Sequence, residues 1–407
     1  MKISGIISEY NPFHNGHKYH IEKTKELAGT DDIVVVMSGN FVQRGEPSIA
    51  DKWLRAKWAL LNGAGLVREL PTIFSTATAE TFAYASVRLL NDTGIIKYIS
   101  FGSESGNISD IKKAASILTN ETGAFSENIK KHLLKGLSFA SARQAAMEET
   151  YGNDFSFMAY PNNILAVEYL KAINKLNSPI LPLTVSRLGE GYNSLNIAEN
   201  ASATAIRKAI SEGKFKTISS SIPENVYETL SQCISNGSAP IYFNNFFQSL
   251  LYILRTSAPE KLSKISGITE GLENRIIKAF ELSGSIEEAS ALIKSKRYAQ
   301  TSIQRALLHI LLNINEDDVN FYKKGVHSPY IRILGFRKDK AYILKHITEN
   351  SKVPVIINIK KSEKHLGPDA LRLLNAERIF TDIYSMAAPN SRMRNIGLEY
   401  TKPIVIV

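Results

Sequence analysis

The sequence has one cysteine, Cys233, among its 407 residues. A single thiol cannot form an internal disulfide, which excludes a disulfide-stapled secreted fold, and no Cys/His spacing typical of a zinc site occurs. The sequence has no apolar run of about eighteen residues and no basic-then-apolar leader, so nothing indicates membrane insertion or export. We therefore expect a cytoplasmic protein with no membrane association, no dedicated metal site and no stable protein partner.

Charge is distributed unevenly along the chain. The net charge is +10 and hydrophobic residues make up 44% of the sequence, a composition that provides ample core for two or three domains. Residues 1–215 carry 23 Lys and Arg against 21 Asp and Glu, whereas residues 216–407 carry 26 against 18. The excess of +8 in the second half is typical of a solvated basic face, and a polyanionic partner is the alternative that it leaves open.

The first twenty residues predict a buried strand, a turn and a helix start. Residues 2–7 are short and mostly apolar, and apolar side chains recur at helical spacing after residue 20. An Asn-Pro and an Asn-Gly pair mark the turn. Because His14 and His17 flank Gly16, both imidazoles are expected to face the unpaired N–H groups of the helix start, which attract anions. The pattern predicts a phosphate cradle; surface histidines in a polar turn are the alternative.

Further strands and helices alternate through the first half. Buried strands are predicted at residues 32–37, 63–71, 95–101 and 180–185. This alternation favours a Rossmann-like, right-handed parallel α/β sheet, whose ligand loops lie at the carboxyl ends of the strands. Gln43 and Arg44 follow the second strand, so they are candidates for substrate or RNA contact unless they are merely exposed.

Two helix starts carry groups suited to a nucleotide. Ser202 and Thr204 begin a predicted helix with Arg207 one turn inside, where the hydroxyls can cap the helix or bind phosphate and Arg207 can stabilise charge on pyrophosphate. Asn162 and Asn163 open another helix, where an amide either caps the helix or contacts a nucleotide.

The pattern becomes mainly helical beyond residue 216. Lys296, Arg297 and Arg305 form a basic run around one aromatic residue, which is suited to RNA phosphates and a stacked base. Lys261-Leu-Ser-Lys264 imitates a KMSKS loop but is interpreted as a helix cap. Strands predicted at residues 330–334, 353–359 and 404–407 are expected to form a small mixed α/β tail that completes the helical part. We predict a nucleotide-binding catalytic domain at residues 1–215 and a basic, mainly helical RNA-binding domain at residues 216–407.

The octapeptide YNPFHNGH at residues 10–17 resembles the HxGH signature of the nucleotidylyltransferase superfamily, and ASATAIR at residues 201–207 resembles its ISSTxIR signature. An ordered set of blocks over nearly the whole chain is similar to the tRNA(Met) cytidine acetate ligases of bacteria. The blocks are residues 8–17, 37–47, 101–104, 161–165, 202–207, 271–275, 296–298 and 331–335. The chain departs from these patterns at Asn11, Gly65, Arg68, Ala201 and Ala203.

The resemblance implies ATP-dependent activation of acetate to acetyl-adenylate and acetyl transfer to N4 of the wobble cytidine of elongator tRNA(Met). ATP would enter as its Mg complex, and His14, His17 and Arg207 would be catalytic. The residues expected at ATP are Ile7, Ser8, Glu9, Tyr10, Asn11, Pro12, Phe13, His14, Asn15, Gly16, His17, Lys18, Tyr19, His20, Gly102, Asn162, Asn163, Arg187, Ser202, Thr204 and Arg207. Two alternatives remain: a small-substrate nucleotidylyltransferase or pantothenate-synthetase-like ligase, and a non-catalytic RNA-binding protein.

Overall fold

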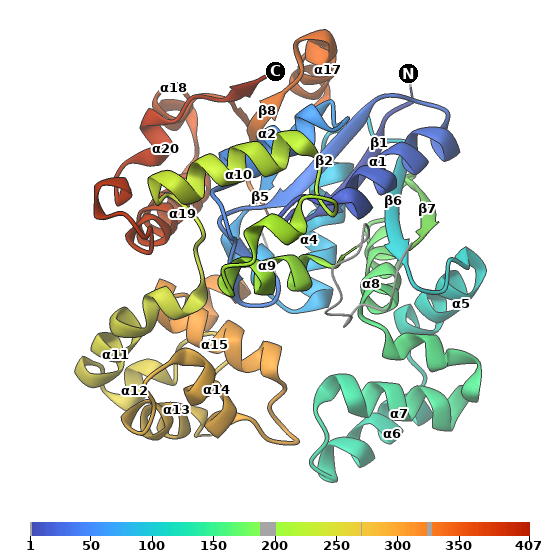
Figure 1. Ribbon diagram of the computed structural model, residues 1–407. Helices are drawn as coiled ribbons and strands as arrows, with labels where there is room; N and C mark the ends of the chain where they lie inside the picture. Colours follow the sequence, from blue (N-terminus) through green and yellow to red (C-terminus); the bar gives the residue numbers. More distant parts are fainter. Residues whose placement is uncertain (1, 188–200, 270, 324–327) are drawn as a thin grey trace.

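Figure 1 shows the computed structural model, which describes residues 2–187, 201–269, 271–323 and 328–407. Within these ranges, eight strands form one sheet in the order β10-β8-β5-β2-β1-β6-β7, with β9 paired to β8. The strands are β1 (Ser4–Ser8), β2 (Ile33–Ser38), β5 (Leu66–Leu70), β6 (Tyr98–Ser103), β7 (Leu181–Ser186), β8 (Ile331–Phe336), β9 (Val355–Ile356) and β10 (Val405–Ile406). The predicted α/β sheet is confirmed.

Strand β1 lies at the point where the strand order reverses. It pairs in parallel with β2 on one side and with β6 on the other, so that Gly5 lies opposite both Val34 and Ile99. The chain runs from β1 through β2 to β5 in one direction and later from β6 to β7 in the other. Loops that leave the carboxyl ends of β1 and β6 therefore diverge, and ligands bind at such a switch point in open α/β sheets.

Side-chain alternation along the central strands divides the core between two faces. Val34 and Val36 pack on one face, whereas Ile33, Val35 and Met37 pack on the other, as the two-residue period of a strand requires. The second face is covered by α1 (Asn15–Ala28), α2 (Lys52–Leu61), α9 (Ala203–Ser211) and α10 (Glu224–Asn236). The first is covered by α4 (Ala79–Asn91), α5 (Ile108–Thr119), α8 (Pro161–Lys175), α17 (Ala341–Asn350) and α19 (Pro368–Met386).

Two helical groups lie beyond the sheet, below it in Figure 1. One contains α6 (Gly123–Leu134) and α7 (Phe139–Tyr151), and the other contains α11 (Phe247–Thr256), α12 (Pro259–Leu262), α13 (Leu272–Glu281), α14 (Ile286–Ile293) and α15 (Gln300–Leu312). Lys261 lies in α12 and Lys264 follows the C-cap residue Ser263, so the KMSKS-like segment is a short helix and its end. No helix in the described ranges combines the length and apolar composition needed to cross a bilayer.

The C-terminal strands differ from the expectation of a separate tail. Strand β8 pairs antiparallel with β5, while β9 and β10 pair in parallel with β8, so all three extend the main sheet. The physical reason is that β5 would otherwise be an open edge, and the buried Ile331, Ile333 and Leu334 of β8 cover it. The proposed division at residue 215 therefore remains a functional prediction, since both halves contribute to one sheet.

Two departures from the family pattern lie at β5, Gly65 directly before the strand and Arg68 within it, and the structure explains only the first. A Cβ atom at Gly65 would lie 3.0 Å from Ile343 Cδ1 and 3.3 Å from the Ile33 carbonyl oxygen, so the site is crowded. Arg68 is fully buried, and no described residue provides a hydrogen-bond partner for its guanidinium nitrogens. Burial lowers the pKa of Arg68 to about 9. Arg68 thus remains an unsatisfied cation inside the core.

Candidate active site

The turn between β1 and α1 brings two imidazoles into contact. His14 is the N-cap residue of α1, and its Nδ1 accepts a hydrogen bond from the Gly16 N–H at 3.1 Å. His17 Nδ1 in turn accepts from the His14 N–H at 3.2 Å. The two rings stack with centroids 3.7 Å apart, and Tyr10 and Phe13 pack against the His17 ring. The HxGH spacing therefore forms a reciprocal capping box built from histidines.

The capping hydrogen bonds decide the tautomer of both histidine rings, and burial decides their charge. Because each Nδ1 accepts from a backbone N–H, the neutral tautomer carries its proton on Nε2. Burial lowers the pKa of His14 to about 3 and also lowers that of His17 well below its usual value, with the nearby Arg187 charge adding to both shifts. Both side chains are consequently neutral donors at Nε2 near pH 7.

The backbone N–H groups at the start of α1 are not free to bind an anion, although the sequence predicts that they are. The Asn15 N–H donates to the Ser221 carbonyl at 3.0 Å, and the His17 and Lys18 N–H groups donate to the His14 carbonyl. With Gly16 bonded to the His14 ring, every N–H group of the first turn is paired. An anion at this turn would therefore meet imidazole Nε2–H donors rather than unpaired helix N–H groups.

The loops after β6 and β7 lie beside this turn. The methylenes of Arg187, directly after β7, lie over Gly102, where a Cβ atom would be 3.4 Å from Arg187 Cγ. The Arg187 N–H donates to the Ser103 carbonyl at 3.3 Å. His20, from the second turn of α1, lies 3.0 Å from the Ser100 hydroxyl through Nε2. The structure thus brings Gly102, Arg187 and the three histidines together at the switch point.

The two asparagines at the start of α8 form a structural clamp with Glu104. The Glu104 carboxylate accepts from the Asn162 side-chain amide at 2.6 Å and from the Asn163 N–H at 2.9 Å. Asn163 Oδ1 accepts from the N–H groups of Glu104 and Ser105, and its Nδ2 donates to the Phe157 carbonyl. The N-cap residue of α8 is Tyr160, and Asn163 accepts from the loop after β6 rather than from the first turn of its own helix. Neither asparagine therefore caps the helix, and their contact with ATP stays a prediction. Sequence reasoning did not single out Glu104.

Arg207 reaches the turn from α9. Ser202 caps this helix by accepting from the Ala205 N–H at 3.2 Å, while Thr204 is exposed. Arg207 donates from Nη1 to the Asn11 carbonyl at 2.8 Å and from Nη2 to Glu46 Oε1 at 2.7 Å. The guanidinium is therefore oriented by two acceptors beside the histidine turn. No sequence signal identified Glu46, because its partner lies 161 residues away.

The side-chain oxygen of Asn11 holds the backbone of a neighbouring loop. Asn11 is buried, and its Oδ1 accepts from the Ile49 N–H at 2.7 Å. A metal contact from this position is therefore disfavoured. Among the residues that the structure describes, no group of three His, Cys, Asp or Glu side chains is placed to hold a metal ion.

A short hairpin joins the turn to the C-terminal half. It consists of β3 (Phe41–Val42) and β4 (Glu46–Pro47), and the Gln43 N–H donates to Glu9 Oε1 at 2.8 Å. Burial raises the pKa of Glu9, against the opposing effects of the Gln43 hydrogen bond and the Arg44 charge. Gly45 has φ +80°, and a Cβ atom there would lie 2.3 Å from the Arg305 backbone nitrogen of α15.

The predicted RNA contacts consequently fall into two places. Gln43, Arg44 and Arg305 lie at the hairpin, next to the turn between β1 and α1. Partial burial there lowers the pKa of Arg305 to about 10. Lys296 and Arg297 are exposed between α14 and α15. Arg305 is therefore part of a contact between the two halves as well as a candidate for RNA.

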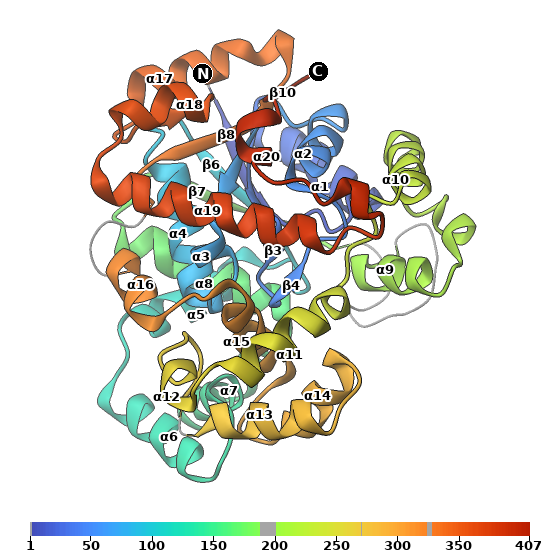
Figure 2. The same cartoon turned by 90° about the vertical axis from the view of Figure 1, so that its left-hand side faces the viewer.

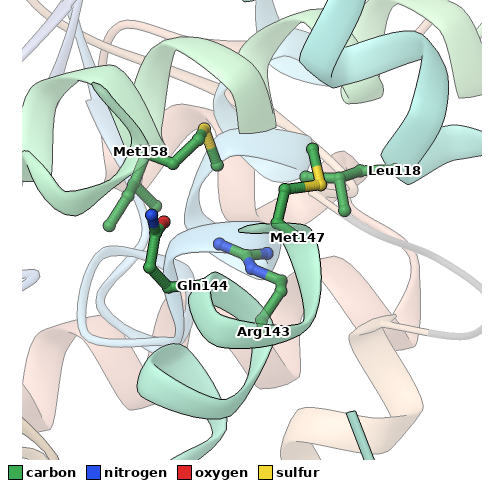
Figure 3. A pocket seen from close by; sticks show the side chains of 6 residues that line it. Leu118, Arg143, Gln144, Met147 and Met158 are labelled. Carbon is green, nitrogen blue, oxygen red and sulfur yellow. The ribbon is translucent and has the colours of Figure 1, made fainter. Parts of the chain in front are cut away.

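A small cavity between α5, α7 and α8 is too small to hold a nucleotide (Figure 3). Its volume is about 10 Å³, close to the least space that holds one water molecule. The lining residues are Leu118, Arg143, Gln144, Met147, Met158 and Ile164. Arg143 is paired with Glu168 at 2.6 Å beside it. The candidate site is therefore the switch-point surface rather than this cavity.

Comparison with known proteins agrees with this geometry. Residues 1–397 match the family described as HIGH Nucleotidyl Transferase. The chain is 38% identical to the tRNA(Met) cytidine acetate ligase of Acetivibrio thermocellus over 415 residues, and 40% identical to that of a Thermoanaerobacter species over 408 residues. Each alignment covers 100% of both chains. The chain belongs to the tRNA(Met) cytidine acetate ligase family.

Two crystal structures of Thermotoga maritima TmcAL share this fold at 32% sequence identity. The apo form superposes with a TM-score of 0.96 and covers 100% of both chains. A form described as bound with alpha-thio ATP superposes with a TM-score of 0.94, covering 100% of this chain and 99% of the other. Because the match spans the whole chain, the C-terminal strands that join the sheet belong to the ligase fold.

Proposed function

We propose that this protein is an ATP-dependent ligase that activates acetate and acetylates N4 of the wobble cytidine of elongator tRNA(Met). The observation that carries the proposal is the full-length identity of 38–40% with proteins named tRNA(Met) cytidine acetate ligase. The histidine turn at the switch point and the related protein crystallised with an ATP analogue support the same activity. The products would be N4-acetylcytidine in tRNA, AMP and pyrophosphate.

The first step would join acetate to the α-phosphate of ATP. An acetate oxygen attacks the α-phosphorus, a new P–O bond forms, and the bond to the departing pyrophosphate breaks. The Nε2–H groups of His14 and His17 are fixed by their Nδ1 hydrogen bonds, so they need little reorganisation to donate to the developing charge. Neutral rings also avoid repulsion with Arg187 and Arg207, which can neutralise pyrophosphate. Mg²⁺ would enter with ATP as part of the substrate.

The second step would transfer the acetyl group to RNA. Cytidine N4 attacks the acetyl carbon, a C–N bond forms, the C–O bond to AMP breaks, and N4 loses a proton. Acetyl-adenylate is hydrolysed by water, so the switch-point surface should be covered while the intermediate is present. The hairpin at residues 41–47 adjoins Glu9, Arg207 and α15, which makes it a suitable place for RNA to cover the intermediate.

We assign RNA binding mainly to residues 216–407, as the charge distribution favours. Lys296 and Arg297 are exposed and would contact phosphates without touching the adenylation turn. The backbone of Arg305 packs at Gly45, a contact that Arg305→Ala would keep, so this replacement is expected to weaken RNA binding while adenylation continues. Gln43 and Arg44 would contact the RNA close to the reacting base.

The decisive experiment is mass spectrometry of nucleosides after incubation of unmodified elongator tRNA(Met) with enzyme, ATP and acetate. We expect N4-acetylcytidine only when all components are present. Acetate-dependent ATP–pyrophosphate exchange without tRNA should accompany it. Exchange with a different small acid and no RNA product would favour the small-substrate ligase, whereas RNA binding without exchange would favour a non-catalytic protein.

A further inference from the structure

The basic excess of the second half is concentrated near its end. Residues 216–330 carry 12 Lys and Arg against 11 Asp and Glu, whereas residues 331–407 carry 14 against 7. The net charges are therefore +1 and +7. Residues 331–407 do not belong to the helical group with Lys296. They form strands β8–β10 of the main sheet and helices α17–α20, drawn in orange to red in Figure 2. Most of the positive excess of the second half thus belongs to a segment that the predicted RNA run does not include.

This C-terminal segment contains an open concavity of about 560 Å³. It lies among α18 (Ile359–Ser362), a short 3₁₀ helix (Glu363–His365) and α20 (Leu398–Thr401). The residues that line it are Lys360, Glu363, Lys364, Gly397, Tyr400 and Thr401. We call it the basic concavity.

The charged groups of the basic concavity are arranged so that the cations remain available. The Tyr400 hydroxyl donates to Glu363 Oε2 at 3.0 Å, and the Arg378 guanidinium lies 4.4 Å from the centre of the Tyr400 ring. The Glu363 carboxylate thus accepts a hydrogen bond from Tyr400, and the Tyr400 ring also contacts Arg378. Lys360 and Lys364 are exposed, and neither has an acidic partner among the residues that the structure describes.

The basic concavity is anchored to the catalytic half. Glu399 of α20 is buried and paired with Lys52 at the start of α2. The Tyr384 hydroxyl of α19 donates to the Ser48 carbonyl at 2.9 Å. Residues 48–52 directly follow the hairpin at residues 41–47 that adjoins the nucleotide turn. The wall of the concavity is therefore joined by direct contacts to the segment that follows this hairpin.

We propose that the basic concavity binds the phosphate backbone of the substrate tRNA, as a second contact separate from Lys296 and Arg297. The inference rests on the proposed function for the identity of the RNA. An open surface with flexible lysines and an Arg stacked on Tyr fits an extended polyanion, whose backbone contacts position the RNA without reading its sequence. It supplies the charge that the helical group lacks.

The test compares tRNA affinity over a salt series for three double variants. Lys360→Ala with Lys364→Ala removes the two lysines of the concavity, and Lys296→Ala with Arg297→Ala removes the helical run. Lys112→Ala with Lys130→Ala is the matched control, because both side chains are exposed on α5 and α6. The probe is unmodified elongator tRNA(Met), and melting temperature and acetate-dependent exchange are measured on each preparation.

We expect the concavity variant to bind tRNA more weakly and to lower the log–log salt slope by roughly one to two, since each lost phosphate contact removes about one. Exchange and melting temperature should match wild type, and the control should retain the full slope. A concavity variant with the affinity and slope of wild type would overturn the proposal, as would an equal loss in the control. Failure of the wild-type protein to bind the tRNA would instead overturn the proposed function together with this inference.

Discussion

The substitution Arg68→Met should stabilise this protein, whereas Arg55→Met should destabilise it. Both arginines are fully buried. The Arg68 guanidinium has no hydrogen-bond partner among the described residues. The Arg55 guanidinium donates to the carbonyl oxygens of Ala50, Glu9, Ser38 and Gly39. The same chemical change therefore removes an unsatisfied cation at one site and a donor to four carbonyl oxygens at the other.

The expected magnitude for Arg68 follows from its pKa. Burial lowers the pKa from 12.5 to about 9, which corresponds to roughly 5 kcal/mol of unfavourable free energy in the charged form. Because the folded pKa lies below the unfolded one, this cost is fully present at all pH values below about 9 and is relieved only above it. The methionine side chain is unbranched and fills part of the same space. We therefore expect the free energy of unfolding to rise by about 1–4 kcal/mol, the range seen when buried ion pairs are replaced by apolar residues.

Burial also lowers the pKa of Arg55, to about 10. Arg55→Met should nevertheless cost about 3–5 kcal/mol, since it removes the guanidinium donor from the carbonyl oxygens of Glu9, Ser38 and Gly39. Urea denaturation at pH 7 measures both effects, and an unchanged m-value would show that the midpoint reports stability. The reasoning is refuted if Arg68→Met is no more stable than wild type, or if both variants shift the midpoint in the same direction.

Three further predictions concern the histidines and the phosphate site. His17→Ala should lower acetate-dependent ATP–pyrophosphate exchange by roughly 10²–10³-fold, the scale of losing one preorganised donor; near-normal exchange would contradict the assignment. Arg207→Lys keeps the charge but loses the planar fork that spans Asn11 and Glu46, so exchange should stay clearly impaired, and full activity would mean that only bulk charge matters. Burial lowers the pKa of His309 to about 4; the folded form therefore loses stability as pH falls from about 6.5 to 4, by roughly 3 kcal/mol from this group. Urea titrations across that range should show a shallower loss in His309→Gln, and an identical pH dependence would exclude this residue as the cause.

The sequence by itself determined the histidine turn between β1 and α1 and whether most segments form helices or strands. Residues 4–28 form the predicted strand, turn and helix, because a buried run, turn residues and a helical period all lie within one short segment. The spacing of His14 and His17 also belongs to this local signal, since residues three apart meet on one helix turn. Ser202 capping α9 followed from the same local logic.

Only the tertiary structure decided which distant groups meet at the site. Periodicity reveals that Ile331 and Ile333 are buried, but not that β8 pairs antiparallel with β5, because strand pairing depends on the order of the whole sheet. The same holds for Glu46, which orients Arg207. A local pattern specifies a residue's face and conformation, while partners more than a hundred residues away are specified by packing alone. The sequence therefore predicted the candidate groups for the chemistry, and the fold decided which residues orient them.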